Sequence, residues 1–369
     1  MGELPFQQAA DIVRTKATSA AVTWTPADLE STLDLRPGEM VEVRSAGEIL
    51  ASLDEHGALD ALPFMPEMLQ FCGKRFRVHR RADKTCNTIN GWGGRRMQRT
   101  VHLADLRCDG QGHGGCQAGC LVFWKEAWLK RVPDGQAAVP LVQLERSPAA
   151  AASRSTDSPE RERLQRAACA TDADGERFTC QATELLRASS HLAWWDVRQF
   201  VRDIRTGDVT PVQMLRVAVL AQRDWLQRRL IKIAYTAFAP AGGVRRRLRR
   251  LTGAPGPSTI TPSEPLDLQP GDLVRVRPVK EILATLDRSS RNRGLYYDIE
   301  MWRFSGGTYR VLRKVEQIID ERTGRMRKLL GGCVILEGVV CSGERSARRR
   351  FCPRSIYSYW RQIWLRRVA

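Results

Sequence analysis

The sequence predicts a mainly β protein with helices, in which two tandem, related small barrel units are separated by a helical insert. Three observations support this fold class: an internal repeat, short apolar segments bounded by Gly and Pro within each repeat, and a helical pattern between the repeats. With 369 residues and 43% hydrophobic composition, the chain is long enough for two or three domains with separate cores.

The repeat is visible as two segments that align without a gap. PGEMVEVRSAGEILASLD begins at Pro37 and PGDLVRVRPVKEILATLD begins at Pro270, which is an offset of 233 residues. The offset holds as far as Cys108 and Cys341, and a three-residue insertion then moves it to 236. Similarity over about 100 residues predicts two copies of one domain-sized unit.

Each unit contains short strands separated by Gly-containing turns, which favours a small barrel. The Pro-Gly-Asp-x-Val-x-Val opening at Pro270 resembles SH3-like barrels, and this resemblance implies a barrel of that kind. Each unit is also expected to be closed by a C-terminal amphipathic helix. The reason is that Ile356, Trp360, Ile363 and Trp364 recur at helical spacing, as do Trp124 and Trp128 in the first copy.

Composition divides the chain into six segments. They are an N-terminal helical extension (1–31), the first barrel unit (32–132), a linker rich in Pro, Ala and Ser (133–160), the helical insert (161–240), a basic Pro-Gly linker (241–265) and the second barrel unit (266–369). Within the insert, Thr210 is expected to cap a long helix that begins at Pro211.

The chain has ten cysteines and no secretory signal at its N-terminus. We therefore expect a cytoplasmic protein whose cysteines bind metal, react or pack rather than form a disulfide framework. Three of them lie in CDGQGHGGCQAGC, which runs from Cys108 to Cys120. Cys116 is expected at the N-terminus of the closing helix, where the helix dipole favours a thiolate, and Cys120 one turn later.

Cys108, Cys116 and Cys120 therefore form a candidate three-thiolate corner of a metal site, which needs a fourth ligand. The candidates for it are Cys180, His113, Cys169, Cys72 and Cys86. Either zinc or an iron–sulfur cluster suits such donors, and the spacing does not distinguish them. In the alternative interpretation, the thiols only pack as small hydrophobic groups. The second unit keeps Cys341 and Cys352 but has Ile356 in place of Cys120.

The net charge of +18 and the pI of about 10.0 predict an anionic partner, namely nucleic acid, another polyanion or an acidic protein. Two arginine runs are the candidate contacts: Arg245, Arg246 and Arg247, and Arg348, Arg349 and Arg350. No apolar run reaches 18 residues, so no transmembrane span is expected.

Together these features favour a metal-stabilised basic binding protein, for nucleic acid or another polyanion. Two alternatives stay open: an iron–sulfur or zinc enzyme, or a subunit that assists one, and a protein-interaction scaffold without metal. The sequence carries no Walker loop, HExxH, GxSxG or dinucleotide-binding motif. Whether the chain is an enzyme is left undecided by the sequence.

Overall fold

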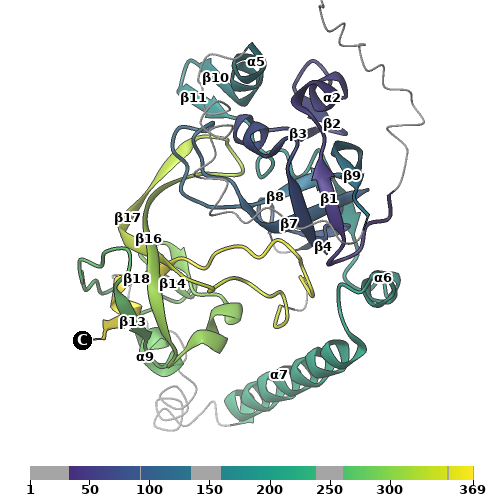
Figure 1. The fold of residues 1–369 in the computed structure, drawn as a ribbon. Coiled ribbons are helices and arrows are strands. Elements are labelled where there is room, and N and C mark those ends of the chain that lie inside the picture. The colour runs from purple at the N-terminus through teal and green to yellow at the C-terminus, as the bar shows by residue number, and fades with distance from the viewer. Residues whose placement is uncertain (1–32, 92, 134–158, 238–260, 347–348, 369) are drawn as a thin grey trace, which may run out of the picture.

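The computed structural model describes residues 33–91, 93–133, 159–237, 261–346 and 349–368. The architecture is mainly β with some helices, and it includes a curled, half-barrel sheet (Figure 1). The expected N-terminal extension, most of the linker at 133–160 and most of the basic linker at 241–265 lie outside the described residues. No helix in the described ranges combines the length and apolar character needed to cross a membrane.

The first sheet has the antiparallel strand order β8-β7-β4-β1-β9. Its strands are β1 (Met40–Val43), β4 (Arg75–Arg81), β7 (Thr100–Arg107), β8 (Leu121–Lys125) and β9 (Leu129–Arg131). Helix α2 (Ala46–Ala51), the pair β2 (Ala58–Leu59) and β3 (Leu62–Pro63), and the 3₁₀ helix η1 (Pro66–Phe71) connect β1 to β4. The core of this sheet is aromatic, because Phe64 packs edge-on against Trp124 and Trp128, which are fully buried.

The second sheet has the order β18-β17-β16-β13-β19. Its strands are β13 (Leu273–Val276), β16 (Thr308–Ile319), β17 (Met326–Leu336), β18 (Trp360–Arg361) and β19 (Leu365–Arg367). The elements that connect β13 to β16 are α9 (Val279–Ala284), β14 (Arg291–Asn292), β15 (Leu295–Tyr296) and η3 (Ile299–Phe304). The hairpin of β16 and β17 is long and reaches across to the hairpin of β10 (Cys169–Asp172) and β11 (Gly175–Phe178) (Figure 1).

The strand registers of the two sheets differ by the same offsets as the aligned sequences. Val41 faces Phe76 in the first sheet, and Val274 faces Tyr309 in the second, so both members of the pair are shifted by 233 residues. In the same way, the pairing of β8 with β7 recurs in that of β18 with β17, with the offset of 236 on the outer strand. Aligned residues therefore take equivalent places in two sheets of the same strand order.

The expected closing helices are wrong. Residues 121–131 form β8, the single-turn 3₁₀ helix η2 (Glu126–Trp128) and β9, and the second sheet ends in β18, η4 (Gln362–Trp364) and β19. Trp124 of β8 and Trp128 of η2 are both fully buried, so both side chains enter the core. The four-residue spacing that resembled a helical stripe arises from this strand–turn–strand geometry.

The insert is not wholly helical. It contains α5 (Pro159–Ala168), β10 (Cys169–Asp172), β11 (Gly175–Phe178), β12 (Ser190–Leu192), α6 (Arg198–Thr206) and α7 (Pro211–Ala237). Strand β12 pairs with β6 (Gly93–Arg96), which pairs with β5 (Lys84–Asn87), so the insert shares a sheet with the first unit. Thr210 lies before α7 as expected, and its hydroxyl accepts a hydrogen bond from the Gln213 backbone N–H (3.2 Å).

His102 in the middle of β7 makes the stability of the first sheet depend on pH. Its Nδ1 lies 2.9 Å from the carbonyl oxygen of Val122, so Nδ1–H donates and the ring is neutral. Burial, together with the charges of His79, Arg354 and Arg80, lowers the pKa of His102 to about 3, although the hydrogen bond to Val122 raises it in part. Because the unfolded chain binds a proton near pH 6.5, this stability is fully present above that pH and is lost as the pH falls towards 3.

Below pH 6, we therefore expect His102 to lower the free energy of unfolding by about 1.4 kcal/mol for each pH unit. His102→Asn should abolish this contribution. The asparagine amide retains a donor near the position of Nδ1 but does not titrate. Urea unfolding of both proteins between pH 7 and about 4 measures this difference. Equal pH slopes for the two proteins would show that His102 does not carry the effect.

Candidate metal centre

The five residues selected from the sequence as metal donors line one cavity of about 40 Å³. They are Cys108, Cys116, Cys120, Cys180 and His113. Four of them belong to the loop 108–120 between β7 and β8, whereas Cys180 reaches the cavity from the insert. Much of the remaining wall is apolar, and it includes Leu121, Val122, Phe123 and Ile319.

The loop 108–120 folds back on itself because its glycines allow close approaches of the backbone. The N–H of Cys108 donates to the carbonyl oxygen of Cys120 (2.9 Å), so the two ends of the loop meet. Gly110 has a φ of +77°, and a Cβ at this position would lie 2.0 Å from the carbonyl oxygen of Cys116. Only glycine combines a positive φ with so close an approach to another backbone segment. Gly110 therefore allows the loop to bring Cys116 back towards its two ends.

No helix begins at Cys116, and the expected effect of a helix dipole on its thiol is wrong. Residues 116–120 are irregular and lead directly into β8. Instead, burial raises the pKa of Cys120 to about 11 and that of Cys180 to about 12. Both side chains are therefore neutral thiols at pH 7 unless a cation replaces their protons.

Cys108 is held from behind by Glu67 of η1, a carboxylate that is almost fully buried. The Cys108 thiol donates to Glu67 Oε1 (2.8 Å), and His113 Nδ1 lies 3.1 Å from the same oxygen. His113 Nε2 lies 3.2 Å from the carbonyl oxygen of Thr179, to which it donates. Among the residues that the structure describes, Glu67, Cys108 and His113 are the one set of three such donors lying within 4.8 Å of one another.

The Glu67 carboxylate is charged and tightly enclosed. Burial raises its pKa, but hydrogen bonds from His113 and Cys108 outweigh burial, and the net shift is downward. Its second oxygen, Oε2, is buried without a hydrogen-bond partner in the described ranges. A Cβ on Gly112 would lie 2.6 Å from this oxygen, so the loop passes Glu67 as closely as glycine permits.

The second unit shows which part of this arrangement is common to both loops. Glu300, the residue aligned with Glu67, is also buried and accepts hydrogen bonds from the loop that follows β17. Its partners are the Ser342 hydroxyl (3.1 Å) and the backbone N–H groups of Arg345 and Ser346 (2.7 Å each). In both loops, the buried carboxylate thus anchors the loop by accepting its hydrogen bonds. Its partners are a thiol and an imidazole in the loop 108–120 alone.

Cys180 is placed by its neighbour Gln181, which joins the insert to the first sheet. The Gln181 side chain accepts from the N–H of Phe123 (2.8 Å) and donates to its carbonyl oxygen (2.9 Å), as a paired strand residue would. It also donates to the carbonyl oxygen of Pro63 (3.1 Å). Because all of these groups are buried, Cys180 is held in place beside β8.

The second unit closes the cavity. The side chain of Gln117 accepts from the backbone N–H of Glu316 (2.6 Å), and the Ile319 N–H donates to the Cys116 sulfur (3.4 Å). Arg354 lines the cavity with a guanidinium that is 3% exposed and lies 3.3 Å from Glu321. A buried positive charge at this position favours a thiolate at Cys120.

The other sequence candidates lie elsewhere. Cys72, Cys86 and Cys169 do not line this cavity, and Cys333 of β17 packs in a core cluster with Val315 and Ile335. Arg245, Arg246, Arg247 and Arg348 lie outside the described residues. Arg349 is buried, with its guanidinium paired to Asp298 and bonded to Ser346, so it does not face solvent as the sequence hypothesis requires. Arg350 is half-buried.

The arrangement gathers soft donors in a small enclosed space, with a charged carboxylate behind one donor and a guanidinium beside another. Such a donor set binds thiophilic metal centres, and no step of catalysis follows from it alone. Glu67 aligns with Glu300 of the second copy, but no signal in the sequence places it beside Cys108 and His113. Comparison of the chain with protein-family models, curated proteins and solved structures finds no match.

Gly112→Ala tests the close packing of the loop on Glu67. We expect it to lower the free energy of unfolding by about 1–3 kcal/mol, because the new methyl group meets the carboxylate. Gly47→Ala is the matched control, since a Cβ there has no atom within 4 Å. Urea unfolding measures both, and in a Glu67→Ala background the cost of Gly112→Ala should shrink. An unchanged cost in that background would contradict the assignment.

Proposed function

We propose that the chain is a metal-stabilised protein that binds nucleic acid or another polyanion and is built from two related SH3-like units. One observation carries the metal part of this proposal: four thiols and an imidazole from two separate segments converge on a single small cavity. Unliganded buried thiols need no such convergence, whereas a metal centre does. Cys108, Cys116, Cys120 and Cys180 are the ligands that we propose.

The spacing of the sulfur atoms favours an iron–sulfur cluster over a single zinc ion. In a tetrahedral zinc site with Zn–S bonds of about 2.3 Å, the sulfur atoms lie ~3.8 Å apart. Among the described residues, no three of the four thiols lie within 4.8 Å of one another. A cluster spreads its ligands over several iron atoms and therefore suits a wider spacing. The N–H of Ile319 that donates to Cys116 is of the kind that tunes a cluster-bound sulfur.

Equivalent strand order and equivalent register support the proposal of two related units. The second unit also has a mechanical role in this proposal, because its β16–β17 hairpin contacts the loop 108–120. Gln317 and Gln117 exchange hydrogen bonds, with the N–H of Gln117 donating to the Gln317 carbonyl (3.0 Å). The metal site thus forms only when both units and the insert are in place.

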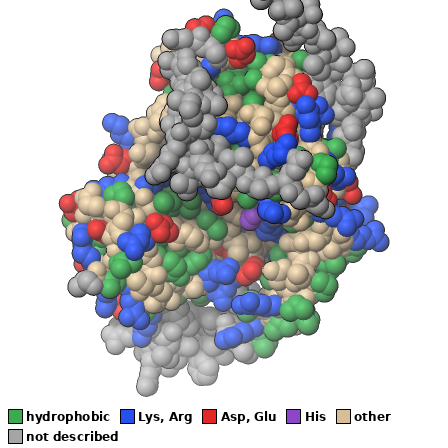
Figure 2. Space-filling model, viewed as in Figure 1, with side chains coloured by type: hydrophobic (Ala, Val, Ile, Leu, Met, Phe, Trp, Pro, Cys, Tyr) green, Lys and Arg blue, Asp and Glu red, His purple; other side chains and the backbone are tan. Residues whose placement is uncertain are grey.

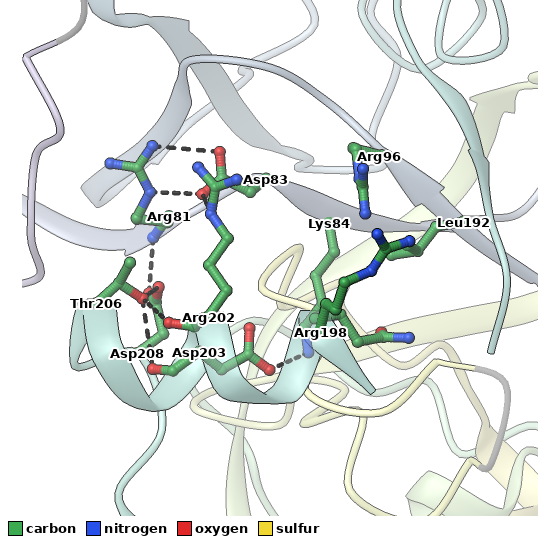
Figure 3. Close-up of a pocket in the computed structure, with 11 residues that line it drawn as sticks. Arg81, Asp83, Lys84, Arg96, Leu192, Arg198, Arg202, Asp203, Thr206 and Asp208 are labelled. Atoms are coloured by element: carbon green, nitrogen blue, oxygen red, sulfur yellow. Dashed lines mark hydrogen bonds and ion pairs between the residues drawn. The ribbon is translucent and has the colours of Figure 1, made fainter. Parts of the chain in front are cut away.

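The polyanion part of the proposal rests on charge. The chain has 59 Lys and Arg against 41 Asp and Glu. On the face shown in Figure 2, Lys and Arg are spread over the surface and gather at the edge where Figure 1 places α6. There, a cavity of about 240 Å³ lies between α6 and the strands of the first unit. Its cationic lining residues are Arg81, Lys84, Arg96, Arg198 and Arg202 (Figure 3).

These cations are of two kinds. Arg81 and Lys84 are buried at the base and committed to ion pairs, with Asp83 and Asp203 respectively (Figure 3). At the rim, the side chains of Arg96, Arg198 and Arg202 are 44%, 84% and 54% exposed. Arg96 and Arg198 share Asp196, and Arg202 shares Asp83 with Arg81. The rim arginines are ion-paired yet exposed, so a phosphate group can approach their guanidinium forks, which are effective donors to phosphate.

Metal analysis tests the first part. Protein purified without air is expected to contain iron and acid-labile sulfide and to absorb in the visible range. Cys116→Ser should lower iron content and thermal stability together, because binding energy of a structural metal centre is folding energy. Stoichiometric zinc without iron would show that the site is mononuclear and that it does not hold a cluster.

Cys333→Ser is the matched control for this measurement. Cys333 is buried, like Cys116, but belongs to β17 and does not line the cavity. Its loss should leave metal content unchanged, although it can lower stability. Protein without any transition metal, or equal metal content in Cys116→Ser and wild type, would contradict the metal proposal.

Binding of a fluorescent single-stranded RNA, followed by anisotropy at several salt concentrations, tests the second part. We expect affinity to fall as salt rises, because each neutralised phosphate releases counterions. The double variant Arg96→Gln/Arg202→Gln should bind about tenfold or more weakly. Arg187→Gln is the control, since the Arg187 side chain is also exposed and ion-paired but lies outside the cavity. Absence of binding at low salt would refute the proposal.

A further inference from the structure

Glu67 and Glu300 are aligned and both buried, but their oxygens are satisfied in different ways. Glu300 accepts hydrogen bonds at both oxygens, because Oε2 accepts from a serine hydroxyl and Oε1 accepts from two backbone N–H groups. Glu67 makes both of its contacts at Oε1, and its Oε2 has no hydrogen-bond partner within the described residues. The charge of Glu67 is therefore less well compensated than that of Glu300, which favours a cation beside Glu67.

The two side chains that contact Glu67 are themselves metal ligands. The Cys108 thiol lies 2.8 Å from Glu67 Oε1, and His113 Nδ1 lies 3.1 Å from the same oxygen. A thiol and an imidazole can each give up a proton and offer a lone pair to a divalent cation. The backbone N–H groups around Glu300 have no lone pair to offer. The first loop has thus replaced simple hydrogen-bond donors by groups that bind metal.

The ring of His113 is oriented to bind an ion on the side of Glu67. Its Nε2 donates to the carbonyl oxygen of Thr179 (3.2 Å). In the neutral ring, Nδ1 then carries a lone pair, and this lone pair faces the Glu67 carboxylate. Two acceptors at this distance repel each other unless a proton or a metal ion lies between them. A backbone carbonyl that holds the other ring nitrogen is also a usual partner of a metal-bound histidine.

The spacing of these three donors suits a single ion. Ligand atoms of Glu67, Cys108 and His113 all lie within 4.8 Å of one another. In a tetrahedral zinc site, nitrogen and oxygen ligands lie ~3.4 Å apart, and sulfur and oxygen ligands lie ~3.6 Å apart. The two contacts of Glu67 are within about 1 Å of these separations, so small side-chain movements admit an ion. The cavity of about 40 Å³, which Cys108 and His113 line, has room for a water molecule as the fourth ligand.

The charges of these ligands balance that of a divalent cation. The Glu67 carboxylate and the Cys108 thiolate together cancel the charge of the ion, and the neutral ring of His113 adds none. A single zinc ion held by four thiolates instead has a net negative charge. Both Glu67 and His113 are almost fully buried, and a buried site without net charge has the smaller desolvation cost.

We propose that Glu67, Cys108 and His113 bind one divalent cation of the zinc type, and that this ion competes with the iron–sulfur cluster for Cys108. Binding displaces the thiol proton of Cys108 to solvent, and Nδ1 of His113 binds the ion without a proton. The mononuclear site needs neither the cluster nor a polyanion, whereas the competition rests on the proposed function. A chain that lacks the cluster is thus able to hold its loop 108–120 closed with zinc.

Zinc titration of the full, reduced, metal-free chain against a chromophoric chelator tests this site. His113→Gln and Glu67→Gln should each weaken the tightest zinc equivalent by about tenfold or more, whereas Cys116→Ser should retain it. His113→Gln keeps an amide donor near the position of Nε2 but has no ligand at Nδ1. His102→Asn is the matched control, because His102 is also buried but does not line the cavity. Near-ultraviolet circular dichroism shows whether each variant is folded.

Reconstitution with iron and sulfide, followed by visible absorbance, tests the competition. Wild-type chain loaded with zinc should form the cluster more slowly than metal-free chain, because zinc must first leave Cys108. In His113→Gln, added zinc should no longer delay cluster formation. An equal delay in wild type and His113→Gln would refute the competition.

The outcomes separate this inference from the proposed function. If no protein forms a cluster but zinc affinity depends on His113 and Glu67 and not on Cys116, the mononuclear site stands and the cluster fails. If His113→Gln and Glu67→Gln both bind zinc as tightly as the wild type, the mononuclear site is refuted. Loss of the tightest zinc equivalent in Cys116→Ser would also refute it, because zinc would then be held by the thiols.

Discussion

A buried carboxylate in each sheet is the constraint on which the rest of this structure depends. Glu67 and Glu300 are buried in the first turn of a 3₁₀ helix, and a buried charge is tolerated only when donors surround it. In the first sheet, the donors come from the loop between β7 and β8, and in the second sheet from the loop between β17 and β18. Each loop must therefore fold over the carboxylate. In doing so, it carries its cysteines to the place where the two units and the insert meet.

The two loops bind their carboxylates with different donors. The second loop uses a serine hydroxyl and backbone N–H groups, which need no special chemistry. The first loop uses the Cys108 thiol and the His113 imidazole, which can also bind metal. Glu300 only anchors its loop, whereas the aligned Glu67 also contacts Cys108, which is a potential metal ligand. This difference explains why the acid is shared while its partners are not.

Much of the architecture could be predicted from the sequence because strand patterns and Gly turns are local signals. The strands around Val41 and Val274 follow the aligned segments, and the four donors within the loop 108–120 were recognisable from their spacing alone. The closing helices could not be excluded, because a strand followed by one 3₁₀ turn gives tryptophans the same four-residue spacing as a helix. Sequence pattern reports periodicity, and only packing against the core decides which structure produces it.

Other features could not be predicted because they depend on pairing between distant segments. The docking of β12 on β6 brings the insert against the first sheet, and Gln181 then fixes Cys180 beside the loop. Arg349 looked like part of an exposed basic run, but Asp298 draws it into the interior.

The central claim is that sulfur atoms from the first loop and the insert hold a metal centre together. X-ray absorption spectroscopy at the edge of the metal present in protein purified without air tests this claim most directly. The account predicts a first shell made of sulfur at about 2.3 Å, with metal–metal scattering if the centre is a cluster. A first shell dominated by nitrogen or oxygen, or the absence of any bound transition metal, would contradict it.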